Sequence, residues 1–341
     1  MNSIRHNAKK FIATISLLVT CGSLLVACGG SSGGSDTTAG IGGTGIVSGK
    51  ITGFGSIHVN GGKFETDNSL FDVDGETFVG QEGQNKLAVG MVIRLRVDTE
   101  NGDFSSTALD VVYDAEIEGP VTTPTVVNTT IKEGIVFGKT ITFDQANTIF
   151  EGTTNFANIG VQGDPGVEDV IEVSGFRVSA TEITATYVRF IEDLGPNSEI
   201  ELRGIITDYD EGVPPGIPET FKIAGITIET DVDTEIEVPN GMLVDGLYVE
   251  VEGGYQSPTS VLAEEIELED EDFDDDIDKI SLEGVVDRFT DNSDFFVGSQ
   301  RVNASTAQFS PPGLMLMDRL NVEVEGPIIG GILIADEVEE E

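Results

Sequence analysis

The sequence predicts an all-β protein built from four tandem copies of one small β-barrel unit. Three observations support this prediction. Strands with alternating apolar and polar residues recur along the chain, and glycine occupies recurring strand positions. After residue 27, no stretch shows apolar residues at helical spacing for three turns. Many short strands with glycine at strand positions are typical of closed or nearly closed barrels, of the OB-like or Greek-key kind.

The recurring strand is clearest near residue 250, where Leu247, Val249 and Val251 alternate with polar residues. This period of two is typical of a strand that buries one face. The same pattern recurs at residues 91–95, 171–173 and 320–324. We expect the charged positions of these strands to lie on the solvent face, namely Glu250, Glu252, Glu323 and Glu325.

Two further landmarks define the unit. An opening strand with a central glycine, apolar-x-Gly-x-apolar, occurs at residues 47–51, 117–121, 202–206 and 282–286. We expect this glycine to let the strand bend or bulge so that a barrel can close, with ordinary turn chemistry as the alternative. A closing Ala-x-x-(Val or Ile) occurs at alanines 77, 78 and 72 residues apart: Ala108, Ala185, Ala263 and Ala335. This period favours tandem small domains over a solenoid.

A hairpin is expected between the opening strand and the alternating strand of each copy. Its pattern is Phe71-x-Val73-x-Gly75, Phe221-x-Ile223-x-Gly225 and Phe295-x-Val297-Gly298, with a looser Ile141-x-Phe143 in the second copy. The landmarks predict four barrels over residues 45–116, 117–193, 199–268 and 280–341. An acid-rich linker is predicted over residues 269–279.

The first 27 residues predict a secretory signal, because they carry three basic residues, no acid and then an apolar run. The run ends in Leu-Val-Ala-Cys, which resembles the lipobox of bacterial lipoproteins, with cleavage before Cys28 and acylation of its sulfur. The alternative is an uncleaved membrane helix. We expect a lipid anchor in a Gram-negative envelope and a flexible Gly/Ser-rich tether over residues 28–44. Gly29 after the cysteine favours the outer membrane over the inner one.

The composition argues against several chemistries. Loss of the signal leaves His58 as the one histidine and Cys28 as the one cysteine, so zinc sites and Ser-His-Asp triads lack their side chains. The sequence has no Gly-x-x-x-x-Gly-Lys-(Ser/Thr) loop and no Gly-x-Gly-x-x-Gly between a predicted strand and a predicted helix, so nucleotide binding by these loops is not expected. The mature chain has 15 Lys and Arg against 61 Asp and Glu, a net charge of −46, which repels nucleic acid. We therefore expect no enzymatic activity, no nucleotide cofactor and no nucleic-acid partner.

Calcium is the cation that the acid-rich segments best suit, because it takes six to eight oxygen ligands. Eight of the ten residues from 269 to 278 are acidic. The weak candidate ligands in this run are Asp270, Asp272, Asp274, Asp275 and Asp276, and a second candidate pair is Asp72 with Asp74. The alternative for the run is a solvated linker, and the alternative for the pair is a hairpin turn at Asp74-Gly75.

Together, the glycine-centred opening, the Phe-x-Val-x-Gly hairpin, the Gly-x-Val-x-Val-Glu-Gly strand and the Ala-x-x-Ile close resemble a bacterial family of tandem β-barrel domains. That family occurs in envelope lipoproteins and carries a domain-of-unknown-function label. The resemblance covers about residues 45 to 341. The second copy departs from it at the hairpin, where Gln145-Ala146 stands in place of the glycine. The resemblance implies no catalytic residues.

These features predict a non-catalytic binding or scaffolding protein that contacts an envelope protein or polymer through several acidic surfaces. The alternative is a carboxylate-dependent hydrolase of envelope glycans, which needs a pair of acids flanking a cleft. A pocket confined to one copy and lined by aromatic residues and paired acids would favour the hydrolase. Equivalent open surfaces on all copies would favour binding.

Overall fold

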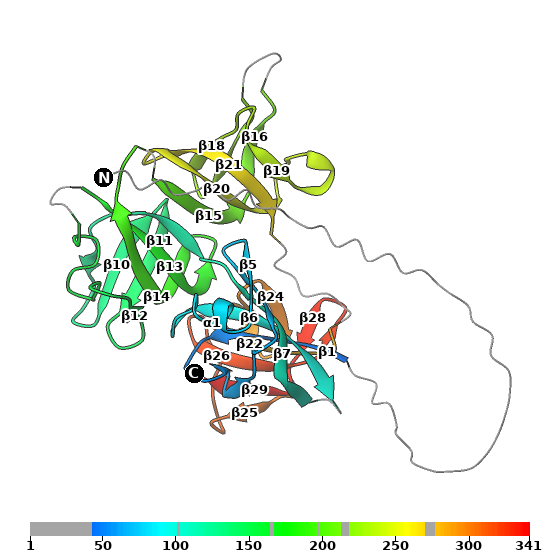
Figure 1. The fold of residues 1–341 in the computed structure, drawn as a ribbon. Coiled ribbons are helices and arrows are strands. Elements are labelled where there is room, and N and C mark those ends of the chain that lie inside the picture. Colours follow the sequence, from blue (N-terminus) through cyan, green and yellow to red (C-terminus); the bar gives the residue numbers. More distant parts are fainter. Residues whose placement is uncertain (1–42, 101–102, 164–166, 197, 213–217, 270–276) are drawn as a thin grey trace, which may run out of the picture. The chain divides into compact units, whose positions relative to one another are not determined.

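Nearly all of the described chain is β-structure, which confirms the predicted fold class (Figure 1). The structure is a computed structural model that describes residues 43–100, 103–163, 167–196, 198–212, 218–269 and 277–341. In these ranges the helices are one α-helical turn, α1 (Gln81–Gln84), and one 3₁₀ turn, η1 (Pro239–Gly241). No helix of the described ranges is long and apolar enough to cross a membrane. The chain from residue 42 onward forms one compact unit.

The third segment, residues 199–268, shows the basic unit most clearly. Its strands are β15 (Glu199–Ile205), β16 (Thr207–Asp210), β17 (Thr220–Ile223), β18 (Ile226–Glu229), β19 (Glu235–Glu237), β20 (Tyr248–Ser257) and β21 (Ser260–Leu268). The long hairpin β20–β21 pairs with the opening strand β15 through β20. The short hairpin β17–β18 returns to β21 by parallel pairing. Val249 and Val251 are fully buried, because alternate residues of β20 face the core.

The remaining strands fall into three further segments. The first segment holds β1 (Gly43–Lys50), β2 (Ile57–Val59), β3 (Gly62–Phe64), β4 (Leu70–Val73), β5 (Glu76–Val79), β6 (Val92–Glu100) and β7 (Asp103–Tyr113). The second holds β8 (Ile117–Val121), β9 (Thr125–Val126), β10 (Ile131–Val136), β11 (Lys139–Asp144), β12 (Ile149–Phe150), β13 (Asp169–Ser179) and β14 (Glu182–Asp193). The fourth holds β22 (Lys279–Asp291), β23 (Asp294–Val297), β24 (Gln300–Asn303), β25 (Gln308–Ser310), β26 (Asn321–Gly326), β27 (Ile328–Ile329), β28 (Ile332–Ile334) and β29 (Glu337–Glu340).

One cross-strand register recurs in all four segments. A short strand pairs in parallel with the closing strand, and one of its apolar residues lies opposite the residue three positions after the landmark alanine. The opposed residues are Phe71 and Val111, Phe150 and Val188, Ile236 and Ile266, and Phe309 and Val338. All four landmark alanines are buried. The Ala-x-x-(Val or Ile) pattern therefore marks a fixed place where the chain crosses the core.

This register shows that the Phe71 hairpin of the first segment is not the counterpart of the Phe221 hairpin of the third, which corrects the prediction from the sequence patterns. The Phe71 hairpin exists, as β4–β5. By its partner Val111, however, Phe71 corresponds to Ile236 and not to Phe221. The counterpart of the β17–β18 hairpin is β2–β3, which turns at residues 60–61. The Phe-x-(Val or Ile)-x-Gly pattern does not match β2–β3, because Ile57 stands where the third segment has phenylalanine.

The second segment has its hairpin earlier than expected. Strands β10 and β11 turn at Phe137-Gly138, where Gly138 adopts a positive φ. Ile141 and Phe143 lie further along, on β11, and both are fully buried. The turn glycine that seemed to be missing in this segment is therefore present, a few residues before the expected place.

The central glycine of each opening strand provides space and does not form a bulge. The pairing of the strands runs without a register shift through all four positions, Gly49, Gly119, Gly204 and Gly284. A Cβ on Gly204 would lie 2.5 Å from Ile223, and a Cβ on Gly284 would lie 2.8 Å from Val297. Both neighbours belong to the hairpin of the same segment, so the expected bulge is wrong and close approach is the reason for glycine. Register shifts occur instead before Gly175 and Gly253.

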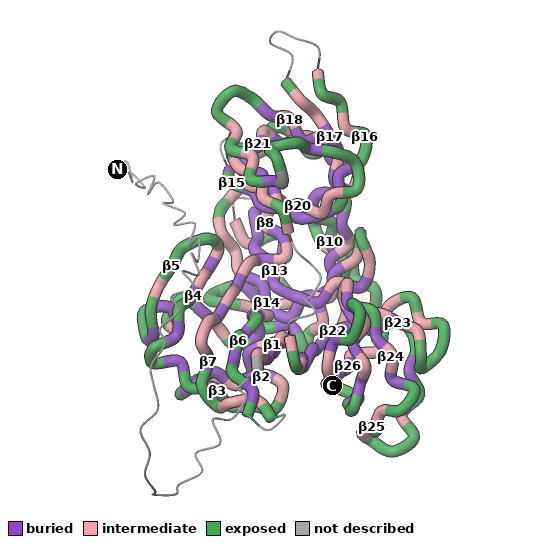
Figure 2. Tube along the Cα trace, turned by 90° about the vertical axis from the view of Figure 1, so that its right-hand side faces the viewer, coloured by how far each residue is buried: buried purple, intermediate pink, exposed green. Residues whose placement is uncertain are grey.

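Strand pairing joins the segments in an order that differs from the chain. Strand β8 of the second segment pairs with β15 of the third. Strand β1 of the first segment pairs in parallel with β22 of the fourth, with Ile46 opposite Ile280. The second and third segments share one hydrophobic core, and Ile46 belongs to the core of the fourth segment. Figure 2 shows the buried positions following the strands through these junctions.

Candidate binding site where the segments meet

Charged residues of the long strands face the junctions between segments rather than open solvent. Glu250, Glu252, Glu323 and Glu325 were expected to be solvent-exposed, but all four are half-buried. Strands β20 and β26, which carry them, lie beside β15 and β22, the strands that join neighbouring segments. Because all four side chains are half-buried, the expected solvent face is wrong for these positions.

Arg203 lies at the centre of this buried charge and is only 7% exposed. Its Nη2 donates hydrogen bonds to Glu250 Oε1 at 2.9 Å and to Glu201 Oε1 at 3.2 Å. Its Nε lies 3.7 Å from Glu269 Oε1. Burial opposes ionisation of Glu250, but the charge of Arg203 together with hydrogen bonds to Glu201, Glu269 and Arg203 lowers the pKa of Glu250 to about 2. Burial raises the pKa of Glu201, and Glu250 raises it further.

Arg177 forms a second ion pair, with Glu116, and both side chains are half-buried. Its Nε and Nη2 donate to the two carboxylate oxygens at 2.9 and 3.3 Å, the bidentate geometry that suits a guanidinium group. The guanidinium carbon also lies 4.8 Å from the ring centroid of Tyr248, a cation–π contact. Arg177 therefore links β13 of the second segment to β20 of the third.

A third charged group connects the first segment to the second. The Tyr113 hydroxyl donates to Glu172 Oε1 at 2.6 Å, and Arg189 pairs with the other oxygen of the same carboxylate. Tyr113 and Glu172 are each 1% exposed. This bond holds β7 against β13 in the interior.

A cavity of about 230 Å³ lies among these groups. We call it the central cavity. All four segments contribute to its wall, with Arg94, Glu116, Arg177, Arg203, Tyr248, Glu269, Glu283 and Gln300 among the lining residues. None of these arginines was singled out from the sequence. A usable signal was present, because an arginine at the polar position of a strand is conspicuous in so acidic a chain.

Six glutamates lie directly opposite one another across six neighbouring strands of one sheet. In order from β13 through β8, β15, β20 and β21 to β19, they are Glu172, Glu118, Glu201, Glu252, Glu265 and Glu235. We call this set the glutamate row. Like charges opposite one another destabilise a sheet. Burial and the nearby Glu172 raise the pKa of Glu118 to about 8, so this carboxyl holds a proton at neutral pH.

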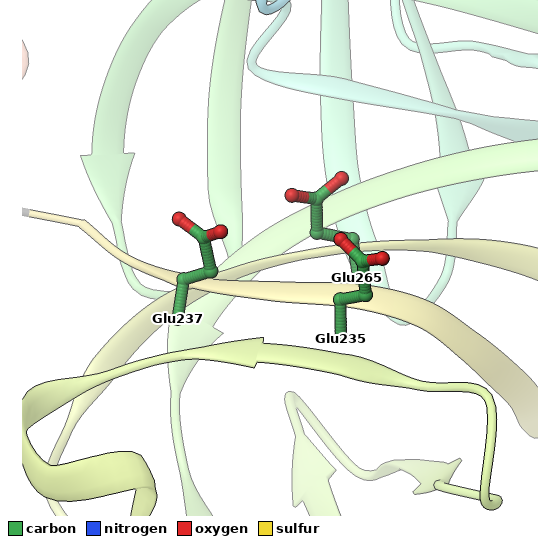
Figure 3. Close-up of side chains that lie close together, drawn as sticks. All are labelled: Glu235, Glu237 and Glu265. Atoms are coloured by element: carbon green, nitrogen blue, oxygen red, sulfur yellow. The ribbon is translucent and has the colours of Figure 1, made fainter. Parts of the chain in front are cut away.

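The outer end of the row forms an acidic cluster (Figure 3). Oxygen atoms of Glu235, Glu237 and Glu265 lie within 4.8 Å of one another. Carboxylates at this separation can contribute oxygen ligands to calcium. This is the one group of three potential ligands among the described residues, and the sequence patterns did not reveal it. Its members come from β19 and β21, which are separated in sequence and meet by parallel pairing.

The predicted pair Asp72 and Asp74 is not part of such a group in the described chain. Asp74 lies in the turn between β4 and β5 with a positive φ, as its turn alternative predicts. Its Oδ1 accepts a hydrogen bond from the backbone N–H of Ala115 at 3.1 Å. Burial and Glu172 raise the pKa of Asp74 to about 7. The other candidates, Cys28 and the run Asp270, Asp272, Asp274, Asp275 and Asp276, lie outside the described residues.

Comparison with known proteins gives a family relationship for part of the chain. Residues 118–189 and 203–267 each match a family described as a domain of unknown function, DUF5666. The two matches cover most of the second and third segments, and they support a repeated domain of that family. No curated protein matches the chain.

Proposed function

We propose that the chain is a non-catalytic, lipid-anchored binding or scaffolding protein of a bacterial cell envelope. The observation that supports this best is that glutamates near the central cavity are paired with arginines. Glu116, Glu172 and Glu250 each form an ion pair with an arginine. A general acid needs a proton that it can transfer to a bound substrate, whereas these carboxylates are held by neighbouring guanidinium groups. Their arrangement suits a structural role.

The expected partner is a cationic envelope protein or polymer. The chain carries a net charge of −43, and the acidic cluster on β19 and β21 presents three carboxylates together. Charge of one sign speeds association with a partner of the opposite sign and makes binding sensitive to salt. Repeated acidic faces on one chain would add avidity.

A co-sedimentation experiment tests this binding. The chain without its lipid anchor is mixed with isolated envelopes, and the bound fraction is measured as salt increases. The triple variant Glu235→Gln, Glu237→Gln, Glu265→Gln should lose binding several-fold, since it removes three clustered charges. The matched control is the triple variant Glu76→Gln, Glu82→Gln, Asp103→Asn. It removes three exposed charges from the first segment, away from the acidic cluster of the third. Equal binding by both variants would contradict the assignment of this face.

The lipid anchor has its own test. Replacing Cys28 by Ser should move the protein from the membrane fraction to the soluble fraction, because acylation needs the sulfur. Mass spectrometry of the wild-type chain should find a modified N-terminal Cys28. A Cys28→Ser variant that stays in the membrane and keeps residues 1–27 would mean that the apolar segment is itself the anchor.

The hydrolase alternative receives less support, because the central cavity is shared by all four segments and is not confined to one. Its sharpest test uses Glu116, a cavity acid that is held by Arg177. Wild type and Glu116→Gln are incubated with envelope glycans, and release of reducing ends is measured. No release by either protein is expected. Release by wild type that is lost in Glu116→Gln would overturn the non-catalytic proposal.

A further inference from the structure

A second and larger cavity, of about 790 Å³, adjoins the central one. We call it the turn cavity. Tight turns from three segments form part of its wall: residues 179–181 between β13 and β14, residues 224–225 between β17 and β18, and residues 298–299 between β23 and β24. This volume lies in the range of small-molecule binding sites. Arg177 and Tyr248 line both cavities.

Lys139 lines the turn cavity and is only 2% exposed. It is the first residue of β11, directly after the turn glycine Gly138. Among the described residues its ammonium makes no hydrogen bond or ion pair, although the buried Glu116 favours its charge. Burial outweighs that effect and lowers the pKa of Lys139 to about 8. A buried amine without a close partner is costly, so its presence beside a cavity calls for a ligand or another role.

The cavity wall is cationic in a protein that is otherwise strongly acidic. Lys139, Arg177 and Arg288 line it together with one acid, Asp287, which pairs with Arg288 at 2.9 Å. The chain as a whole has 18 basic residues against 61 acidic ones. The Tyr248 hydroxyl is buried on the same wall and has no hydrogen-bond partner among the described residues. It can donate to a bound oxygen atom.

We propose that the turn cavity binds a small organic anion, a carboxylate or phosphate, with Lys139 as the buried positive charge. Arg177, Arg288 and the Tyr248 hydroxyl supply further donors to the same anion. Hydrogen bonds from charged donors are strong and favour ligands with clustered anionic oxygens. This site depends neither on the lipid anchor nor on the acidic cluster, so it can fail or stand separately from the proposed function.

Pyridoxal 5′-phosphate is a suitable probe, because it carries an aldehyde and a phosphate on one small ring. The neutral amine of Lys139 attacks the aldehyde carbon and water leaves, which gives an imine. Borohydride then delivers a hydride to the imine carbon, and the nitrogen takes a proton from water, which leaves a stable secondary amine. Labelling of each lysine in the detergent-solubilised full chain is measured at neutral pH by peptide mass spectrometry. Pyridoxal, which lacks the phosphate, is the matched probe.

Lys139 should be labelled by pyridoxal phosphate about tenfold more than the exposed Lys63 and Lys86, which corresponds to one charge-assisted contact. Pyridoxal should show a clearly smaller preference, because the lowered pKa of Lys139 makes its amine more reactive toward both probes but only pyridoxal phosphate carries the anion. Excess inorganic phosphate should protect Lys139 from pyridoxal phosphate. Arg288→Gln should reduce labelling of Lys139 by pyridoxal phosphate several-fold. The control is Arg301→Gln, which removes an exposed arginine outside the cavity.

Two results would overturn the proposal. The first is labelling of Lys139 by pyridoxal phosphate that is no stronger than that of Lys86, or a preference for Lys139 over Lys86 that is equal with both probes. Either outcome shows that the site does not select an anion. The second concerns stability. Lys139→Met should keep the β-sheet circular dichroism spectrum and unfold at the same or higher urea concentration, because it removes a buried charge that has no close partner. A large loss of stability would mean that Lys139 has a structural role.

Discussion

Arg203 shows how a single buried residue connects neighbouring strands of the third segment. It faces Glu201, Glu250 and Glu269, and its side chain is 8% exposed. Glu201 lies on β15, Glu250 lies on β20 and Glu269 directly follows β21. The guanidinium group therefore fixes the relative positions of these three strands. Removing it would leave buried carboxylates without a counter-charge, which is costly in a medium of low dielectric constant.

We predict that Arg203→Gln lowers the free energy of unfolding by about 3 to 5 kcal/mol, the cost of breaking a buried ion pair. Urea unfolding at neutral pH, followed by circular dichroism, measures this. The control is Arg96→Gln, which breaks the more exposed pair of Arg96 with Asp110 and should cost less than about 1 kcal/mol. The gap between the variants should narrow near pH 5, where the orphaned glutamates can take up protons. Equal costs at neutral pH would contradict the central role of Arg203.

At the scale of elements, the opening strand and the hairpin of each segment approach so closely that glycine is required between them. We predict that Gly204→Ala lowers the free energy of unfolding by about 1 to 3 kcal/mol, because the new Cβ overlaps Ile223. Thermal unfolding of the full chain measures the loss.

Gly254→Ala is the matched control on β20 of the same segment. A Cβ at residue 254 meets only Gln256, at 4.0 Å, so this change should be close to neutral. If Gly204→Ala were as mild as Gly254→Ala, the explanation from close packing would be wrong.

The glutamate row makes a prediction about pH at the same scale. The folded state raises the pKa of Glu118 from 4.5 to about 8, so folding favours the protonated form. Stability from this group is therefore complete below pH 4.5 and is lost as the pH rises toward 8. We expect the free energy of unfolding to fall between about pH 5 and pH 8.5. The lowered pKa values of Glu116 and Glu250 act at more acidic pH and leave this window unaffected.

Glu118→Gln should remove on the order of 1 kcal/mol of this pH dependence, because glutamine keeps the shape and cannot ionise. Urea unfolding at several pH values checks the slope. The exposed Glu133, on β10 of the same segment, provides the control Glu133→Gln, whose slope should match that of wild type. An unchanged slope in Glu118→Gln would show that the row does not titrate as its burial implies.

At the scale of the whole molecule, the segments share cores and strand pairings, so they should not unfold independently. The second and third segments contribute to one hydrophobic core. The chain contains no tryptophan, so single insertions can report on each segment separately. We predict that Phe150→Trp in the second segment and Tyr255→Trp in the third show the same fluorescence midpoint in urea. Each fluorescence midpoint is corrected by the circular dichroism midpoint of the same variant. If the corrected midpoints differ, the two segments unfold as separate domains.

The sequence by itself determined the strand content and the repeated landmarks. Alternation of apolar and polar residues and the alanine spacing depend on local chain geometry, because successive strand residues point to opposite faces. The landmark alanines are accordingly buried, and the alternating valines face the core. The correct partners of these strands were harder to predict. Phe71 and Phe221 look alike in sequence, and only the register against β7 and β21 separates them.

Only the tertiary structure decided what the polar faces do. The period-two pattern places Glu250 and Glu118 on the polar face of their strands. It cannot say whether solvent or another segment covers this polar face. Packing between segments covers such faces, as where Phe176 and Val178 of β13 pack with Val285 of β22 and Val92 of β6, and these contacts join residues far apart in the chain. The glutamate row and the contact of Arg177 with Tyr248 likewise cross from the second segment to the third. They depend on how complete segments fit together, which a period-two pattern in one strand does not encode.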